Sequence, residues 1–285
     1  MDATDNKAFK KAMISENERR KMDFLDYICK EGRADLTEKL VKLRKNAIAL
    51  KLVETDDNEI PVGTSKSGGY PDLPPTILYP TLSEYTVQWE FGPKKGKTEH
   101  YKESSMQLVT QLNLSETAEY DKDNLLPKTG MLYIFWSGEL MLNDCKYCKY
   151  KFSGKNTNVY KVIYYDGDLS QLKRTAPPCP YYSKSFETVL KSYLIQPDYC
   201  KYDYYVEDEI DLYYNARDDF NVNNCSKLLG YQTGSMNVDE PAEGWTNLFE
   251  FNYHSGCIWG LNWFVNKKSL SERTFNDIYF TWDID

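Results

Sequence analysis

The chain has 285 residues, 41% of them apolar and 27% charged, and a formal net charge of −8 from 35 Lys and Arg against 43 Asp and Glu. A chain of this length and composition can bury a large core. The acidic balance disfavours a non-specific grip on phosphate backbones, and no apolar run is long enough to cross a bilayer. We therefore expect a cytoplasmic protein with no nucleic-acid partner and no membrane partner.

The amino-terminal region is rich in charge and predicts helices. Residues 5–31 place scattered apolar side chains among charges, and Gly32 follows in the manner of a helix C-terminal cap. From Asp35 onwards an apolar stripe advances by four, three, four and three residues, which is typical of one helix face, and its members are Leu36, Leu40, Leu43, Ala47 and Leu50. We expect residues 1–45 to form a helical extension, with the end of the stripe passing into a strand over residues 48–53.

The amino-acid composition changes after residue 60. Glycines and prolines at 68–75 predict an ordered loop, and residues 92–104 look like a surface excursion. Short β-branched and aromatic runs predict strands at 106–114, 130–137, 158–165, 245–253, 257–265 and 277–282. A helix is expected at 185–194 and a helical turn at 267–273.

Two parts of the chain resemble each other, from Gly69 to Trp136 and from Gly230 to Val265. In each, a Gly-Tyr pair leads to a strand with alternating polar residues and then to a Gly-initiated apolar strand. Each copy offers one apolar face that the other can cover. The sequence therefore predicts an α+β fold in which residues 46–285 form one domain of duplicated, mostly antiparallel β-sheet halves with a pseudo-two-fold relation.

Five blocks occur in a recognisable order, and they read SGGYPDLP at 67–74, QLVTQLNL at 107–114, LPKTGMLYIF at 126–135, LLGY at 228–231 and FNDI at 275–278. This order resembles the YwqG-like family of bacterial domains of unknown function over residues 46–285. The resemblance implies a duplicated α+β fold, an intracellular setting and no assigned activity. Some members are found near toxin and immunity genes, which implies a protein-binding role.

The chain departs from the family pattern in its second copy. Trp259-Gly260 is followed by Leu261 where relatives have an aspartate, and Gly230-Tyr231 is followed by Gln232-Thr233-Gly234 where relatives have a proline or aromatic residue before a glutamine. Both departures concern any site that the family would build from the carboxyl-terminal copy.

Residues suited to catalysis are scarce. The only histidines are His100, expected on the surface, and His254, expected in a turn, and the chain contains no nucleophile elbow, phosphate-binding loop, dinucleotide fingerprint or His-Glu-x-x-His pair. We assign no catalytic residue and no cofactor, and favour a protein that is not an enzyme.

Seven cysteines, an odd number, favour reduced thiols over a closed disulfide framework. Cys145 and Cys148 have the spacing of a zinc knuckle, and Cys179, Cys200 or His100 could complete a site. Because no second closely spaced pair exists, we assign no metal site and keep a zinc-stabilised scaffold around Cys145 and Cys148 as an alternative.

An acidic, tyrosine-rich stretch covers residues 202–214. It is read either as a solvated edge strand that deters sheet-to-sheet pairing or as a face that binds a basic protein.

The strongest candidates for a shared ligand-binding site are polar residues at equivalent places in the two copies, namely Gln111, Asn113, Glu250 and Asn252. Strand alternation puts both members of each pair on the same side of their strand. They line a polar groove between the repeats, or they cap backbone groups and face water. The sequence favours a non-catalytic intracellular binding protein that engages an unknown protein partner, with an immunity or inhibitor-type role included. The alternative is an enzyme or small-ligand-binding protein with its site in that groove.

Overall fold

The structure is a computed structural model and describes residues 24–138, 148–181, 193–203, 225–232, 243–255 and 258–284. At residues 196–203, 253–255, 258–259 and 283–284 it describes the backbone alone. In the described part of the chain, no helix combines the length and the hydropathy that a membrane span requires.

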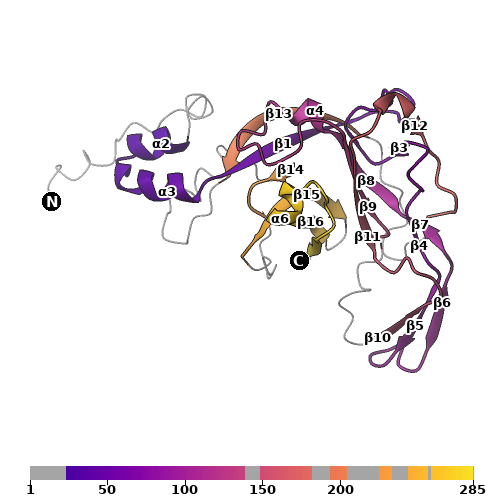
Figure 1. Ribbon diagram of the computed structural model, residues 1–285. Helices are drawn as coiled ribbons and strands as arrows, with labels where there is room; N and C mark the ends of the chain where they lie inside the picture. Colours follow the sequence, from indigo (N-terminus) through magenta and orange to yellow (C-terminus); the bar gives the residue numbers. More distant parts are fainter. Residues whose placement is uncertain are drawn as a thin grey trace.

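A ten-stranded sheet forms the body of the molecule (Figure 1). Every ladder in it is antiparallel, so the expected mostly antiparallel sheet with few helices is confirmed. From edge to edge its strands are β11 (Tyr160–Tyr165), β9 (Met131–Trp136), β8 (Gln107–Asn113), β2 (Lys66–Ser67), β13 (Tyr193–Asp203), β1 (Lys45–Glu54), β14 (Ser226–Leu229), β15 (Trp245–Ser255), β16 (Ile258–Asn266) and β17 (Ile278–Ile284).

Three small sheets and several short helices surround this body. A three-stranded sheet projects from it in Figure 1 and consists of β10 (Cys148–Phe152), β5 (Tyr85–Trp89) and β6 (Thr98–Tyr101). Two-stranded sheets pair β12 (Lys173–Arg174) with β3 (Asp72–Leu73) and β4 (Thr81–Leu82) with β7 (Ser104–Ser105). The described helices are α2 (Phe24–Lys30), η2 (Ala34–Leu36), α3 (Thr37–Leu43), α4 (Leu114–Thr117), η4 (Leu169–Gln171) and α6 (Lys267–Ser271).

The predicted apolar stripe from Leu36 to Leu50 is not one helix. Helix α3 ends at Leu43, and Arg44 adopts an extended conformation that leads into β1. Ala47 pairs with Leu229 of β14 on one side and with Lys201 of β13 on the other. Pairing on both sides requires an extended chain, so tertiary contacts override the helical spacing.

Two further expectations concern residues 92–104 and 185–194. Most of residues 92–100 are exposed, as expected of a surface excursion, but the segment also contains β6, which pairs with β5, and Ser104, the first residue of β7, which pairs with β4. The helix expected at 185–194 falls mostly outside the described residues, and its last two positions, Tyr193 and Leu194, begin β13. The six strands and the helical turn predicted from β-branched and aromatic runs are present, with ends that differ by no more than a few residues.

The main core lies between the two halves of the large sheet. It combines side chains from both, such as Leu112 and Trp136 from one half and Phe249 and Trp263 from the other. The outermost strands also meet through side chains, because the Tyr160 ring of β11 lies 5.3 Å from the Phe280 ring of β17. The sheet therefore folds over on itself, and its interior is a packed apolar core.

Candidate functional site

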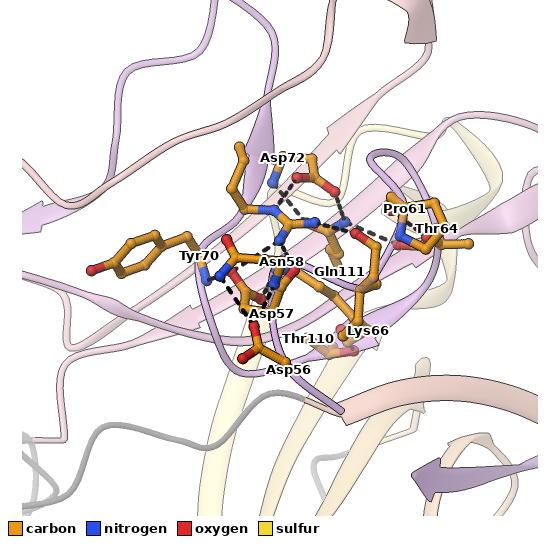
Figure 2. A network of polar contacts seen from close by, with 12 residues as sticks. Asp56, Asp57, Asn58, Pro61, Thr64, Lys66, Tyr70, Asp72, Thr110 and Gln111 are labelled. Atoms are coloured by element: carbon orange, nitrogen blue, oxygen red, sulfur yellow. Dashed lines mark hydrogen bonds and ion pairs between the residues drawn. The ribbon is translucent and has the colours of Figure 1, made fainter. Parts of the chain in front are cut away.

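An extensive polar cluster surrounds Asp72, a fully buried residue of β3 (Figure 2). Its carboxylate accepts hydrogen bonds from Arg174 Nε at 2.6 Å, Gln111 Nε2 at 2.7 Å and the Gly63 N–H at 2.9 Å. The backbone N–H of Asp72 donates to Gln111 Oε1 at 2.8 Å, so Asp72 and Gln111 are joined twice. These contacts hold β3 against β8.

Lys66, on β2, extends this cluster with a fully buried ammonium group. Its Nζ lies 2.5 Å from Asp57 Oδ1, and Arg174 Nη1 lies 3.0 Å from Asp57 Oδ2. Two cations and two carboxylates, including Asp72, therefore neutralise one another, as a buried set of charges requires. We call these four residues and Gln111 the Lys66 cluster.

Burial and charge act in opposite directions on the ionisable groups of the Lys66 cluster. Burial lowers the pKa of Lys66 below its ordinary value, although the Asp57 carboxylate opposes this change. Burial also acts to raise the pKa of Asp57, but Lys66, the Tyr70 N–H and Arg174 outweigh it, so that pKa lies below its ordinary value. The pKa of Arg174 is raised, because its carboxylate partners Asp72 and Asp57 outweigh burial. At neutral pH Asp57 and Arg174 are therefore charged.

The other half of the sheet holds a second buried lysine. Lys227 of β14 pairs in register with Glu250 of β15, and its Nζ lies 3.7 Å from Glu250 Oε2. Both side chains are buried, and so is Asn262 of β16, the register partner of Glu250. Asn262 Oδ1 has no hydrogen-bond partner among the residues that the structure describes.

The same backbone anchor occurs beside both lysines. Ser65, immediately before Lys66, accepts a hydrogen bond on Oγ from the Asn113 N–H at 2.9 Å. Ser226, immediately before Lys227, accepts one from the Asn252 N–H at 3.1 Å. Each serine thus ties a short strand to the longer strand beside it.

The four residues predicted to share a ligand site lie in two separate places. Gln111 belongs to the Lys66 cluster, whereas Glu250 contacts Lys227. The side chain of Asn113 donates to the Gly63 carbonyl at 2.9 Å and accepts from the Ser115 N–H, which caps helix α4. The space between the two halves is filled by the apolar core, so Gln111, on the opposite side of its strand from Leu112, does not face that space. Ligand binding by these residues stays a prediction.

The histidines and cysteines are spread over the molecule. His100 is exposed on β6, and His254 lies in β15, where the side chain is outside the described part. Cys145 is also outside the described residues. Cys29, Cys179 and Cys225 are free, as expected, but Cys148 is bonded in a disulfide, so its sulfur is not a free thiolate ligand here. Where the chain is described, no three His, Cys, Asp or Glu residues are grouped to hold a metal ion.

The acidic, tyrosine-rich stretch at 202–214 lies outside the described residues beyond Asp203, whose backbone ends β13. Its two interpretations therefore stay predictions.

Sequence reasoning missed the contribution of Arg174, which contacts Asp57 and Asp72 from a distant part of the chain. It also missed a hydroxyl pair in which Tyr79 and Tyr181 lie 3.0 Å apart, and a surface groove beside the edge strand β11.

A search of curated proteins finds no match to this chain. A scan against protein families matches residues 65–284 to the family described as domain of unknown function DUF1963. The match starts at Ser65, so it includes Lys66, Asp72, Gln111, Arg174 and both members of the Lys227–Glu250 pair. The chain belongs to this family of unknown function.

Proposed function

We propose that this chain is a non-catalytic binding protein that engages another protein. The observation that carries the proposal is the internal use of the buried charges in the Lys66 cluster. Lys66 is fully buried against Asp57, and Asp72 is fully buried against Arg174 and Gln111. Groups held in this way are closed to a substrate, whereas the large apolar residues Leu78 and Phe91 have relative exposures of 88% and 55% and leave apolar surface for a protein partner to cover.

Affinity capture from the source cells, with the native chain as bait and mass spectrometry of cross-linked complexes, tests this proposal. We expect a partner in stoichiometric amount that also binds the purified chain. A chain that captures no stoichiometric partner, but turns over a metabolite in an activity screen, would contradict the proposal.

We further propose that the two halves are a duplication with a pseudo-two-fold relation. The order of strands supports this, because β13 and β1 lie in the middle and one short strand, β2 or β14, lies next on either side. The Ser65-Lys66 and Ser226-Lys227 pairs, with their matching asparagine anchors, support it as well. So does the left-handed backbone at Gly68 and Leu229, with φ of 69° and 62°, two residues after each lysine.

Within the DUF1963 family, we propose that the chain is a YwqG-like bacterial protein that works in the cytoplasm, in an immunity or inhibitor-type role. The ordered blocks at 67–74, 107–114 and 126–135 support the assignment to the YwqG-like group. Capture of a toxin in an inactive complex would support the role, and a toxin that stays active when bound would contradict it.

A second candidate function is the binding of a small anionic ligand where the halves meet. A hollow of about 400 Å³ is lined by residues 124–127 from one half and by Thr246, Lys267 and Arg273 from the other. Its size suits a small molecule, and its cations suit a carboxylate or phosphate. A thermal-shift screen of anionic metabolites tests this candidate, with Lys267→Ala expected to abolish a shift that Lys268→Ala retains. A screen in which no anionic metabolite shifts the melting temperature excludes this second candidate function.

A further inference from the structure

A groove of about 320 Å³ lies beside β11, the edge strand at one end of the large sheet. Residues 78–81 line it, together with Met106, Tyr160 and Ile163. We call it the β11 groove. Leu78, one of these lining residues, has a relative exposure of 88% and offers apolar surface that a ligand in the groove would cover.

The edge of β11 is open to another strand in the described part of the chain. β11 pairs with β9 on one side and ends the sheet on the other. Along β11, Tyr160, Val162 and Tyr164 pack against the main core, so the alternate residues Lys161 and Ile163 face the groove. An extended peptide paired with this edge would place every second side chain over the groove.

The charge at the β11 groove is positive although the protein as a whole is acidic. Lys155 and Lys161 line the groove, and no carboxylate is among its lining residues. Both lysines are exposed, and neither has an ion-pair partner in the described structure. Lys94, Lys128 and Lys149, by contrast, pair with acidic residues. Two unpaired cations beside an apolar surface match a ligand that carries carboxylates and apolar side chains together.

The loop that carries Lys155 is fixed before any partner binds. The Asn156 N–H donates to Ser83 Oγ at 3.1 Å, and the Ser83 N–H donates to the Asn156 carbonyl at 2.9 Å. Asn156 Nδ2 also donates to Thr81 Oγ1 at 3.2 Å. Three hydrogen bonds thus hold this wall of the groove, and a preformed wall reduces the entropy lost on binding.

We propose that the β11 groove binds an extended segment of a partner protein, in which acidic residues alternate with apolar ones, by adding it as a strand to the edge of β11. This inference rests on the proposed function and specifies its surface. Backbone hydrogen bonds to β11 supply affinity, apolar side chains cover Leu78 and Ile163, and carboxylates meet Lys155 and Lys161.

The test measures binding of short, capped synthetic peptides to the full chain by fluorescence anisotropy. Asp or Glu alternates with Val, Leu or Phe in these peptides, and Lys replaces the acidic residues in a matched set. We expect the acidic set alone to bind, with an affinity that falls as ionic strength rises. The double variant Lys155→Glu/Lys161→Glu is expected to lose about tenfold or more in affinity for the acidic peptides. The substitutions replace two attractive lysine–carboxylate pairs with repulsion between carboxylates. Leu78→Ala is expected to lose about tenfold, which is the loss of a buried leucine contact.

The matched control reverses two exposed lysines outside the β11 groove, Lys102→Glu/Lys173→Glu, and is expected to bind as the natural chain does. Peptides N-methylated at odd or at even positions test strand addition directly. Only one of the two sets removes the N–H groups that face β11, so one is expected to bind and the other to fail.

Several outcomes would overturn the inference. Equal binding by both N-methylated sets excludes strand addition, and equal loss in the two lysine double variants excludes the β11 groove. Displacement of the peptide by millimolar phosphate or citrate shows a site for small anions instead. If no acidic peptide binds but the captured partner still binds both lysine double variants, the β11 groove is wrong and protein binding stands. If no partner is captured either, the proposed function fails with it.

Discussion

Replacing Asp57 by asparagine tests whether a carboxylate keeps the Lys66 ammonium in the interior. Lys66 is fully buried, whereas Asp57 retains 20% of its side-chain exposure and also contacts Arg174. The substitution leaves a buried cation without its closest carboxylate, and breaking a buried ion pair costs about 3–5 kcal/mol. We expect Asp57→Asn to lower the free energy of unfolding by about 3 kcal/mol at neutral pH, the lower end because Asp57 is in part solvated.

The matched variant Lys66→Met removes the cation and keeps a side chain of similar length. Asp57 then retains Arg174 and its contact with solvent, so we expect a cost of about 1 kcal/mol or less. Equilibrium urea unfolding, followed by tryptophan fluorescence, measures both values. The comparison requires that the variants keep the same m, the slope of unfolding free energy against urea concentration.

The pH dependence of Asp57→Asn gives an independent measurement. The pKa of Lys66 lies below its ordinary value of 10.5, and loss of the Asp57 carboxylate lowers it further. Between the folded pKa and 10.5 the unfolded chain binds more protons than the folded chain, so stability rises with pH across that window. The difference in free energy of unfolding between Asp57→Asn and the natural chain should therefore shrink from pH 7 to pH 10. Equal costs for the two variants, or a deficit that does not change with pH, would refute the reasoning.

Two further predictions concern the backbone and the sheet edges. Gly130 has φ of 95°, and a Cβ there would lie 2.6 Å from the Tyr165 carbonyl oxygen, so Gly130→Ala is expected to cost about 3 kcal/mol in thermal or urea unfolding. Gly92→Ala, at φ of 78° with no atom within 4 Å of the added Cβ, should cost about 1 kcal/mol, and similar values for both would contradict the steric argument. Tyr160→Phe removes a hydroxyl that donates to the Ile278 carbonyl at 2.8 Å and should cost about 1 kcal/mol in urea unfolding. Because burial raises the pKa of Tyr160 above 10.0, its contribution is present below pH 10 and is lost as pH rises through the higher folded pKa, a loss that Tyr160→Phe should lack.

Local patterns were sufficient to predict most of the long strands of the sheet, although not β13. Runs such as 130–137 and 158–165 are rich in β-branched and aromatic residues, and β9 and β11 occupy them. The strand expected over residues 48–53 is present within β1, but the helical spacing misled at Ala47, which fits a helix face and yet lies in the strand. There β13 and β14 pair with the chain from both sides, and neither partner is visible in the local sequence.

The candidate site was harder to predict because its contacts join distant parts of the chain. Gln111 was identified from its place in a repeated strand, but its partner Asp72 lies in the two-residue strand β3, and Arg174 reaches Asp72 from β12. A single arginine or a single aspartate carries no signal of the pairing in one sequence. The Lys227–Glu250 pair could have been inferred, because the glutamate stands at the predicted equivalent of Gln111 and the lysine three residues before the second Gly-Tyr pair.

The central place of β1 in the sheet has a consequence for synthesis on the ribosome. Ala47 emerges early, yet its two neighbours in the ladder, Lys201 and Leu229, are translated only in the last third of the chain. Until then an apolar strand with two open edges is exposed to other nascent chains, and such non-local pairing is slow. Productive yield should therefore respond to chaperone supply and to translation rate more strongly than the equilibrium stability of the finished protein would suggest.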